Sequence, residues 1–152
     1  MALHQDFSDI LRCLNDAGAK YLIVGAHAVS FYTEPRFTKD IDILVEPTLE
    51  NAAKVYRALL EFGAPLRGVG VEDLANPTMM YQIGVEPVRI DIIMGIDGVD
   101  FQNAWSKKVA TNFGEEKIYI LGIDDLIKAK KIASRDQDHL DLKKLAKVKK
   151  KK

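Results

Sequence analysis

Hydrophobic and polar positions alternate along this chain with two periods, one typical of helices and one typical of strands. Between residues 6 and 18, apolar side chains recur every three or four residues, which predicts a helix with one apolar face; they are Phe7, Ile10, Leu11 and Leu14. The short apolar run over 21–24 predicts a buried strand. A brief helix is expected over 25–32, and a loop containing proline over 33–39.

The middle of the chain predicts three strands and one long helix. Residues 40–45 alternate polar and apolar positions, as a strand does. A helix is expected over 47–62, ended by Gly63, with an apolar stripe of Ala52, Val55, Leu59 and Leu60. Two further apolar runs, 79–83 and 88–94, flank a turn with Gly and Pro and predict a β-hairpin.

The last third is predicted to be mainly helical. A short helix over 101–105 and a strand over 117–121 are expected first. Helices over 125–134, with Asp124 as its N-cap, and over 137–146 follow. The sum predicts an α/β (α+β) domain with a small mixed sheet flanked by helices and a helical C-terminus.

Composition narrows the class of protein. A chain of 152 residues with 47% hydrophobic side chains suits one globular domain, expected over 1–146, with a basic, disordered tail over 147–152. No apolar run is long enough to cross a membrane, and the N-terminus does not resemble a secretory signal. The single cysteine, Cys13, fits a cytoplasmic protein and excludes a zinc site built on several cysteines.

The formal net charge of zero conceals an uneven distribution. Residues 128–152 hold 11 Lys and Arg against 3 Asp and Glu, so the remainder of the chain is correspondingly acidic. Such a basic segment is attracted to phosphate-rich partners, although a frayed, solvated end is the more ordinary explanation. The charge pattern therefore leans weakly toward RNA as a partner.

The strongest candidate for chemistry is a set of three acids in apolar strands. Asp40 and Asp42 are two positions apart, so both side chains point to the same face of the strand. Asp91 lies within a second apolar strand, and the three carboxylates meet if the two strands are neighbours. Like charges repel, and two Mg²⁺ ions about 4 Å apart are one compensation, suited to phosphoryl transfer. An ion pair of Asp91 with Arg89 or Arg36 is the structural alternative.

A glycine turn precedes these acids. Gly25 ends the first predicted strand and opens a helix, where free backbone N–H groups bind phosphate. The acid pair follows this strand–glycine–helix turn at close range in the sequence. The pattern therefore predicts a phosphate-binding turn beside a metal site. A purely steric turn at Gly25 is the alternative.

These motifs resemble the minimal nucleotidyltransferases of the DNA polymerase beta superfamily, and more narrowly their AbiEii-type (toxin, MenT-like) branch. The resemblance rests on the turn Gly25-Ala26-His27-Ala28, on an Arg-x-Thr-x-Asp-hydrophobic-Asp strand over 36–42, and on Asp91. It extends to a Leu-Ile-x-x-Lys motif ending in Lys130 and an Arg-x-x-Asp motif over 135–138. Where many members have Gly or Ser, this chain has Ala26, so no serine hydroxyl is available for phosphate.

The resemblance implies a two-metal reaction of a nucleoside triphosphate (NTP). Asp40, Asp42 and Asp91 are expected to hold two Mg²⁺ or Mn²⁺ ions, with Asp91 as general base. The NTP, ATP being one candidate, is expected to contact a set of five residues: Gly25, Ala26, His27, Arg36 and Lys130. The acceptor hydroxyl is expected on an RNA or tRNA end, a protein or a small molecule such as an antibiotic. Relatives include components of toxin–antitoxin and phage-defence systems, so a cognate antitoxin is an expected partner.

Two other classes of function stay open at this stage. One is a non-catalytic antitoxin or regulatory module that retains the nucleotidyltransferase fold. The other is a phosphodiester hydrolase that uses the same metals with water as acceptor.

Overall fold

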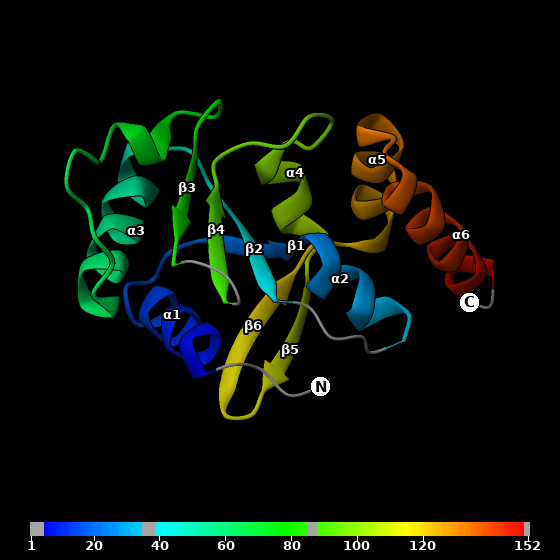
Figure 1. Ribbon diagram of the computed structural model, residues 1–152, viewed down its shortest axis with the longest axis horizontal. Helices are drawn as coiled ribbons and strands as arrows, with labels where there is room; N and C mark the ends of the chain where they lie inside the picture. Colours follow the sequence, from blue (N-terminus) through cyan, green and yellow to red (C-terminus); the bar gives the residue numbers. More distant parts are fainter. Residues whose placement is uncertain (1–4, 35–38, 85–87, 151–152) are drawn as a thin grey trace.

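A computed structural model describes residues 5–34, 39–84 and 88–150 (Figure 1). The predicted residues Arg36 and Thr38 lie outside the described part. The helices are α1 (Gln5–Asp16), α2 (Gly25–Tyr32), α3 (Leu49–Phe62), α4 (Phe101–Ser106), α5 (Ile123–Ala133) and α6 (Asp136–Lys150), with a 3₁₀ turn, η1 (Asp73–Ala75). The strands are β1 (Tyr21–Val24), β2 (Asp40–Val45), β3 (Met80–Ile83), β4 (Arg89–Ile93), β5 (Val109–Phe113) and β6 (Glu116–Ile120).

The six strands form one mixed sheet in the order β3-β4-β2-β1-β6-β5. The pairs β2–β4 and β1–β6 are parallel, and the other pairs are antiparallel. The expected fold class, a small mixed sheet with flanking helices and a helical C-terminus, is confirmed. Of the described helices, none has the length and apolar character that crossing a membrane requires.

The core lies between the sheet and the helices that flank it. Ile41 and Ile43 of β2 are fully buried and belong to the same apolar cluster as Ile10 and Leu14 of α1. Because side chains alternate along a strand, burying these isoleucines on one face directs Asp40 and Asp42 to the other. The alternation predicted from the sequence therefore sets which face carries the acids.

Helix α3 begins and ends as its sequence predicts. The Thr48 hydroxyl accepts a hydrogen bond from the Asn51 backbone N–H at 3.2 Å, which satisfies one free donor of the first turn. Gly63 ends the helix with φ +93°, a left-handed conformation that favours glycine. One expectation was wrong: Leu60 is 56% exposed and does not belong to the buried stripe.

Two further expectations need correction, and one strand was not expected. Strand β5 was not predicted, because Val-Ala-Thr-Asn-Phe at the sheet edge is only half-buried and carries no strong apolar period. The N-cap of α5 is Gly122 and not Asp124, whose carboxylate instead pairs with Lys149 at 2.6 Å. Helix α6 continues to Lys150, so residues 147–150 are helical and do not form the disordered tail that we expected.

Candidate active site

The three predicted acids lie on one side of the neighbouring parallel strands β2 and β4. In their register Asp42 lies beside Asp91, and Asp40 lies beside Arg89. All four side chains line a cavity of about 500 Å³, bounded on one side by the sheet and on the other by residues of α5 and α6. The expectation that Asp91 lies opposite the acid pair on an adjacent strand is confirmed.

Gly25 brings the turn after β1 into direct contact with the acids. Strand β1 is antiparallel to β2, and its last residue, Val24, pairs with Asp42. Gly25 follows with φ +68°, and a Cβ atom added to it would lie well inside van der Waals contact of Asp42 Oδ2. A larger residue would therefore be strained and would displace Asp42. The first residue of α2 is thus fixed by sterics at the edge of the cavity.

Asp42 is the most electrostatically perturbed acid of this cavity. Burial, a hydrogen bond with Asp91 and the charges of Asp91 and Asp40 raise the pKa of Asp42 to about 7, while Arg89 acts in the opposite direction. Asp42 therefore keeps its proton up to about neutral pH, which relieves its repulsion with the neighbouring carboxylate of Asp91. A divalent cation that binds both oxygens would replace this proton.

Arg89 is the residue whose role the sequence left unresolved. Its Nη2 lies 3.0 Å from Asp40 Oδ2 and its Nε lies 3.2 Å from Asp91 Oδ1, so one guanidinium joins two of the three acids. The signal was available, because Arg89 precedes Asp91 by two positions on one strand and therefore shares its face. The contact with Asp40 depends on the pairing of β2 with β4, which the spacing within one strand does not indicate.

The ion pairs of Arg89 with Asp40 and Asp91 change the metal site that we expected. Among the described residues, no three His, Cys, Asp or Glu side chains are arranged to hold one metal ion. The three converging carboxylates that we expected are therefore not preformed, since Asp40 binds Arg89 while Asp42 and Asp91 face each other. The available oxygens are still the hard ligands that Mg²⁺ prefers, and the Asp42–Asp91 pair suits a divalent cation chemically.

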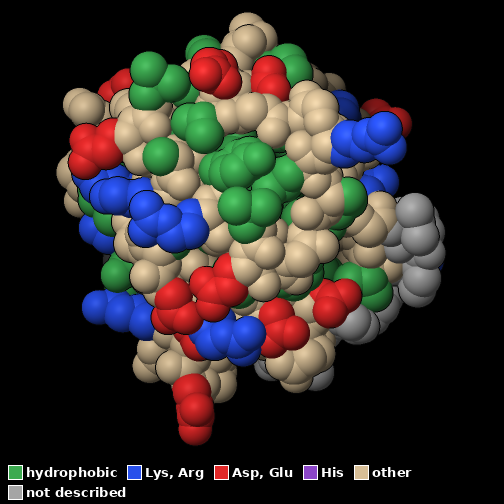
Figure 2. All heavy atoms as spheres, turned by 90° about the vertical axis from the view of Figure 1, so that its left-hand side faces the viewer, with side chains coloured by type: hydrophobic (Ala, Val, Ile, Leu, Met, Phe, Trp, Pro, Cys, Tyr) green, Lys and Arg blue, Asp and Glu red, His purple; other side chains and the backbone are tan. Residues whose placement is uncertain are grey.

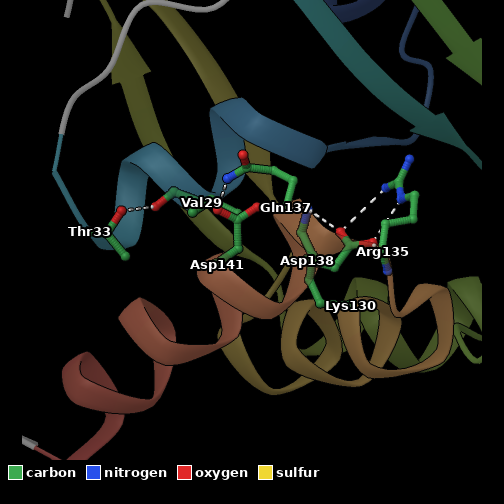
Figure 3. Close-up of polar contacts among 7 residues, drawn as sticks. All are labelled: Val29, Thr33, Lys130, Arg135, Gln137, Asp138 and Asp141. Atoms are coloured by element: carbon green, nitrogen blue, oxygen red, sulfur yellow. Dashed lines mark hydrogen bonds and ion pairs between the residues drawn. The ribbon is translucent and has the colours of Figure 1, made fainter.

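The opposite wall of the cavity is a network of ion pairs between α5 and α6 (Figure 3). The Lys130 ammonium lies 3.0 Å from Asp138 Oδ1 and 3.1 Å from Asp141 Oδ2. Arg135 donates from Nε to Asp138 Oδ2 at 2.7 Å and from its backbone N–H to the same oxygen at 3.1 Å. Burial opposes ionisation of Asp138, but its bonds with Arg135 and Lys130 prevail and hold its pKa well below the usual range.

Of the eight predicted site residues, seven lie in the described part of the chain, and the structure brings five of them together. Those that line the cavity are Gly25, Asp40, Asp42, Asp91 and Lys130. His27 is only 4% exposed and packs edge-on against Phe7, with ring centroids 5.5 Å apart, so it lies in the core. Ala26 is not among the described lining residues of the cavity, and Arg36 lies outside the described part of the chain.

Two solved structures share the fold over nearly the whole chain. The lincosamide antibiotic adenylyltransferase LnuA, solved with lincomycin bound, matches with a TM-score of 0.60 and 17% identity, covering 97% of this chain and 98% of LnuA. The Thermotoga maritima protein TM1012, assigned provisionally to the nucleotidyltransferases, matches with a TM-score of 0.56 and 16% identity, covering 96% of both chains. No curated protein matches the sequence. At these identities the likeness establishes a nucleotidyltransferase-like fold.

The family follows from the sequence match. Residues 3–152 match the model of the family described as nucleotidyl transferase of unknown function (DUF2204). The chain therefore belongs to this family. The expectation of a nucleotidyltransferase is confirmed at this level.

Proposed function

We propose that this nucleotidyltransferase transfers a nucleoside monophosphate from an NTP to an acceptor hydroxyl in the cavity between β2, β4 and α5. The observation that carries the proposal is the adjacency of Asp42 and Asp91 on parallel strands, directly beside the glycine turn at Gly25. A carboxylate pair whose repulsion is tolerated inside a fold requires a compensating reason. Binding of a divalent cation with a nucleotide supplies one.

Asp40, Asp42 and Asp91 are the residues that would hold Mg²⁺, two ions being expected and Mn²⁺ a substitute. Bound there, the ions would neutralise the charge that develops on the phosphoryl group and orient the attacking and leaving oxygens. Arg89 Nη2 lies 3.0 Å from Asp40 Oδ2. Binding of Mg²⁺ by Asp40 therefore requires that this ion pair break. Gly25, the first residue of α2, lines the cavity, so the backbone N–H groups of this helix start would be the donors for a phosphate oxygen.

The proposed reaction is a single displacement at the α-phosphorus of the NTP. Asp91 accepts the proton of the acceptor hydroxyl, whose oxygen forms a bond to the α-phosphorus. The bond between this phosphorus and the oxygen that bridges to the β-phosphorus breaks, and pyrophosphate leaves with that electron pair. Lys130 and Arg135 line the opposite wall, where a cation that keeps free donors would meet the departing phosphates.

The acceptor and the biological setting are proposed more narrowly from the motifs. The Gly-Ala-His-Ala turn and the Arg-x-x-Asp motif favour the AbiEii-type branch, hence a component of a toxin–antitoxin or phage-defence system with a cognate antitoxin. An RNA or tRNA end is one acceptor class, supported by the basic helix α6. A small hydroxylated antibiotic is another, supported by the fold shared with LnuA.

A second function is favoured by one observation. Arg89 already neutralises Asp40 and Asp91 by ion pairs, so the fold tolerates its acids without a metal. A non-catalytic antitoxin or regulatory module would keep such an arrangement permanently. This alternative predicts that NTP and Mg²⁺ do not bind.

The deciding experiment incubates the purified protein with each of the four α-labelled NTPs, Mg²⁺ and total cell extract. Pyrophosphate release and label on an RNA, a protein or a small molecule support the proposal and identify the acceptor class. Asp42→Asn and Asp91→Asn are expected to abolish the label, whereas Asp16→Asn, a matched change at an exposed acid of α1, is expected to leave it unchanged. Release of nucleoside monophosphate to water alone would indicate the hydrolase instead.

A further inference from the structure

We infer that Arg135 binds the triphosphate of the nucleotide in this cavity, and that Lys130, the cation expected from the sequence motif, stays engaged with Asp138 and Asp141. The inference rests on the proposed function, because it concerns the nucleotide of the same site. The resemblance instead implies that Lys130 meets phosphate, and it includes Arg135 only as part of the Arg-x-x-Asp motif.

Lys130 is fully engaged by two buried carboxylates. Its side chain is 10% exposed, and those of Asp138 and Asp141 are 1% and 0% exposed. Turning the ammonium toward a nucleotide would take a cation away from both acids inside the protein. Removing one partner from a buried ion pair is strongly unfavourable, because the remaining charge has neither water nor a counter-ion. Lys130 therefore serves the contact between α5 and α6.

Arg135 has the opposite character. Its side chain is 75% exposed and lines the same cavity as Gly25 and Asp42. In Figure 3 it extends away from α5 and α6, with Asp138 along one edge of the guanidinium. Asp138 engages Nε and Nη2, and among the described residues no other carboxylate contacts this group. The Nη1 donors and the second Nη2 proton are thus available to a ligand.

The backbone fixes the direction of this side chain. Ser134, the residue before Arg135, has φ +52°, and among the described residues it is the one non-glycine with a positive φ. The Ser134 N–H bonds to the Lys130 carbonyl at 2.9 Å, which ends α5, and the Arg135 N–H bonds to Asp138 at 3.1 Å, within the start of α6. A non-glycine residue in this conformation is held by its surroundings and is often found at functional sites. The turn orients Arg135 toward the cavity.

The charge balance of the cavity explains why an arginine is needed here. Lys130 and Arg135 together match Asp138 and Asp141, so this wall is neutral, whereas the opposite wall carries the acids around Asp42. A triphosphate therefore requires a cation that keeps donors free after its own ion pair is formed. A guanidinium does so, because its planar set of donors can bind a carboxylate along one edge and phosphate along another.

The test is the affinity of the full chain for inorganic tripolyphosphate and for each of the four NTPs, measured by calorimetry with Mg²⁺ present. Arg135→Gln is expected to weaken binding of tripolyphosphate and of the preferred NTP at least about tenfold. Arg135→Lys is expected to recover part of this loss, since it restores the charge without the second donor edge. Lys131→Gln, at an exposed cation of α5 outside the cavity lining, is the matched control and is expected to bind as the parent does.

Each outcome separates this inference from the proposed function. A parent protein that binds neither tripolyphosphate nor any NTP contradicts both. Parent-like binding by a folded Arg135→Gln protein overturns the inference alone and returns the phosphate contact to Lys130. Equal losses in Arg135→Gln and Lys131→Gln would also overturn it, because they would show a general effect of charge. Melting temperatures of the free proteins establish that every variant is folded.

Discussion

Gly25 shows at the scale of one residue how closely the fold and the candidate site depend on each other. Its positive φ of +68° and the clash that any Cβ atom would make with Asp42 Oδ2 give two separate reasons for glycine. We expect Gly25→Ala to destabilise the protein by more than the roughly 1–2 kcal/mol that a left-handed conformation alone costs. It should also weaken NTP binding, since Asp42 must move. Thermal unfolding and calorimetry measure the two effects.

Gly114 provides the control for this prediction. Its φ is +56°, but a Cβ added there would meet nothing within 4 Å. Gly114→Ala should therefore show the cost of the backbone conformation without a clash. If both substitutions lower stability equally and Gly25→Ala binds NTP as the parent does, the close approach of Gly25 to Asp42 matters neither for stability nor for NTP binding.

The raised pKa of Asp42 predicts an unusual dependence of stability on pH in the metal-free protein. The folded state holds a proton on Asp42 up to about pH 7, whereas the unfolded chain releases it near its ordinary value of 3.8. Stability should therefore fall as the pH rises from about 4 to 7, by at most about 1.4 kcal/mol for each pH unit. Above pH 7 the penalty from this group is complete.

Asp42→Asn isolates this contribution, because asparagine keeps the shape and removes the charge. Without metal, the variant should be more stable than the parent at pH 8 and equal to it near pH 4. Its transferase activity should be lost. Denaturant unfolding across this pH range checks the sign, and a variant that is less stable at pH 8 would identify Asp42 as a structural partner of a cation.

At the scale of elements, buried ion pairs join α5 to α6. Asp138 is 1% exposed and is bonded to both Lys130 and Arg135. We expect Asp138→Asn to destabilise the protein by about 3–5 kcal/mol at pH 7, because Lys130 loses one of its two buried counter-ions. Chemical unfolding at pH 7 measures this loss.

The same carboxylate gives a second, opposite dependence on pH. Because the folded pKa of Asp138 is lowered, its stabilising effect is present above about pH 4 and is lost as the pH falls further. The difference in stability between the parent and Asp138→Asn should therefore shrink below pH 4. A constant difference would show that Asp138 acts by shape and not by charge.

The elements also show how far the sequence alone could lead. The acid pair on β2 was predictable because side chains in a strand alternate, so the i and i+2 positions share a face whatever the tertiary structure. The pairing of Asp42 with Asp91 needed only that two apolar strands be neighbours. The ion-pair partners of Arg89 and Lys130 could not be settled from the sequence. The partner that a long cationic side chain binds depends on the distances between different helices and strands. Strand β5 was missed because an edge strand has little burial to mark it.

At the scale of the whole molecule, basic side chains gather toward the C-terminal end of the last helix. Helix α6, at the right of Figure 1, carries five of the basic side chains of the C-terminal segment: Lys143, Lys144, Lys147, Lys149 and Lys150. Figure 2 shows the opposite side, where Lys, Arg, Asp and Glu side chains are interspersed around a hydrophobic group. An extended polyanion bound at the cavity would therefore meet positive potential along α6. The tail expected from the sequence is mostly helical, so this charge is presented on a rigid element.

Binding of Mg²⁺ and NTP in the cavity is a prediction that involves the whole fold, because the walls of the cavity come from distant parts of the chain. Gly25 follows β1, and the acids lie on β2 and β4. Lys130 lies on α5, and Arg135 lies in the turn between α5 and α6. A ligand that binds only the folded protein stabilises it by RT ln(1 + [L]/Kd), which is about 2.7 kcal/mol at a hundredfold excess over Kd. Mg²⁺ with NTP should therefore raise the melting temperature by several degrees.

Mg²⁺ alone should raise the melting temperature less than Mg²⁺ with NTP does, because Arg89 must leave Asp40 and the phosphates would supply a new counter-ion. Arg89→Gln tests this step. The variant removes the competing cation, so its metal-free form should be less stable, from repulsion among the acids, and its response to Mg²⁺ alone should be larger than that of the parent. Asp91→Asn should respond to neither ligand. If the parent melts at the same temperature with millimolar Mg²⁺ and NTP as without them, the acids around Arg89 form a closed ion-pair network and the chain is a non-catalytic member of its family.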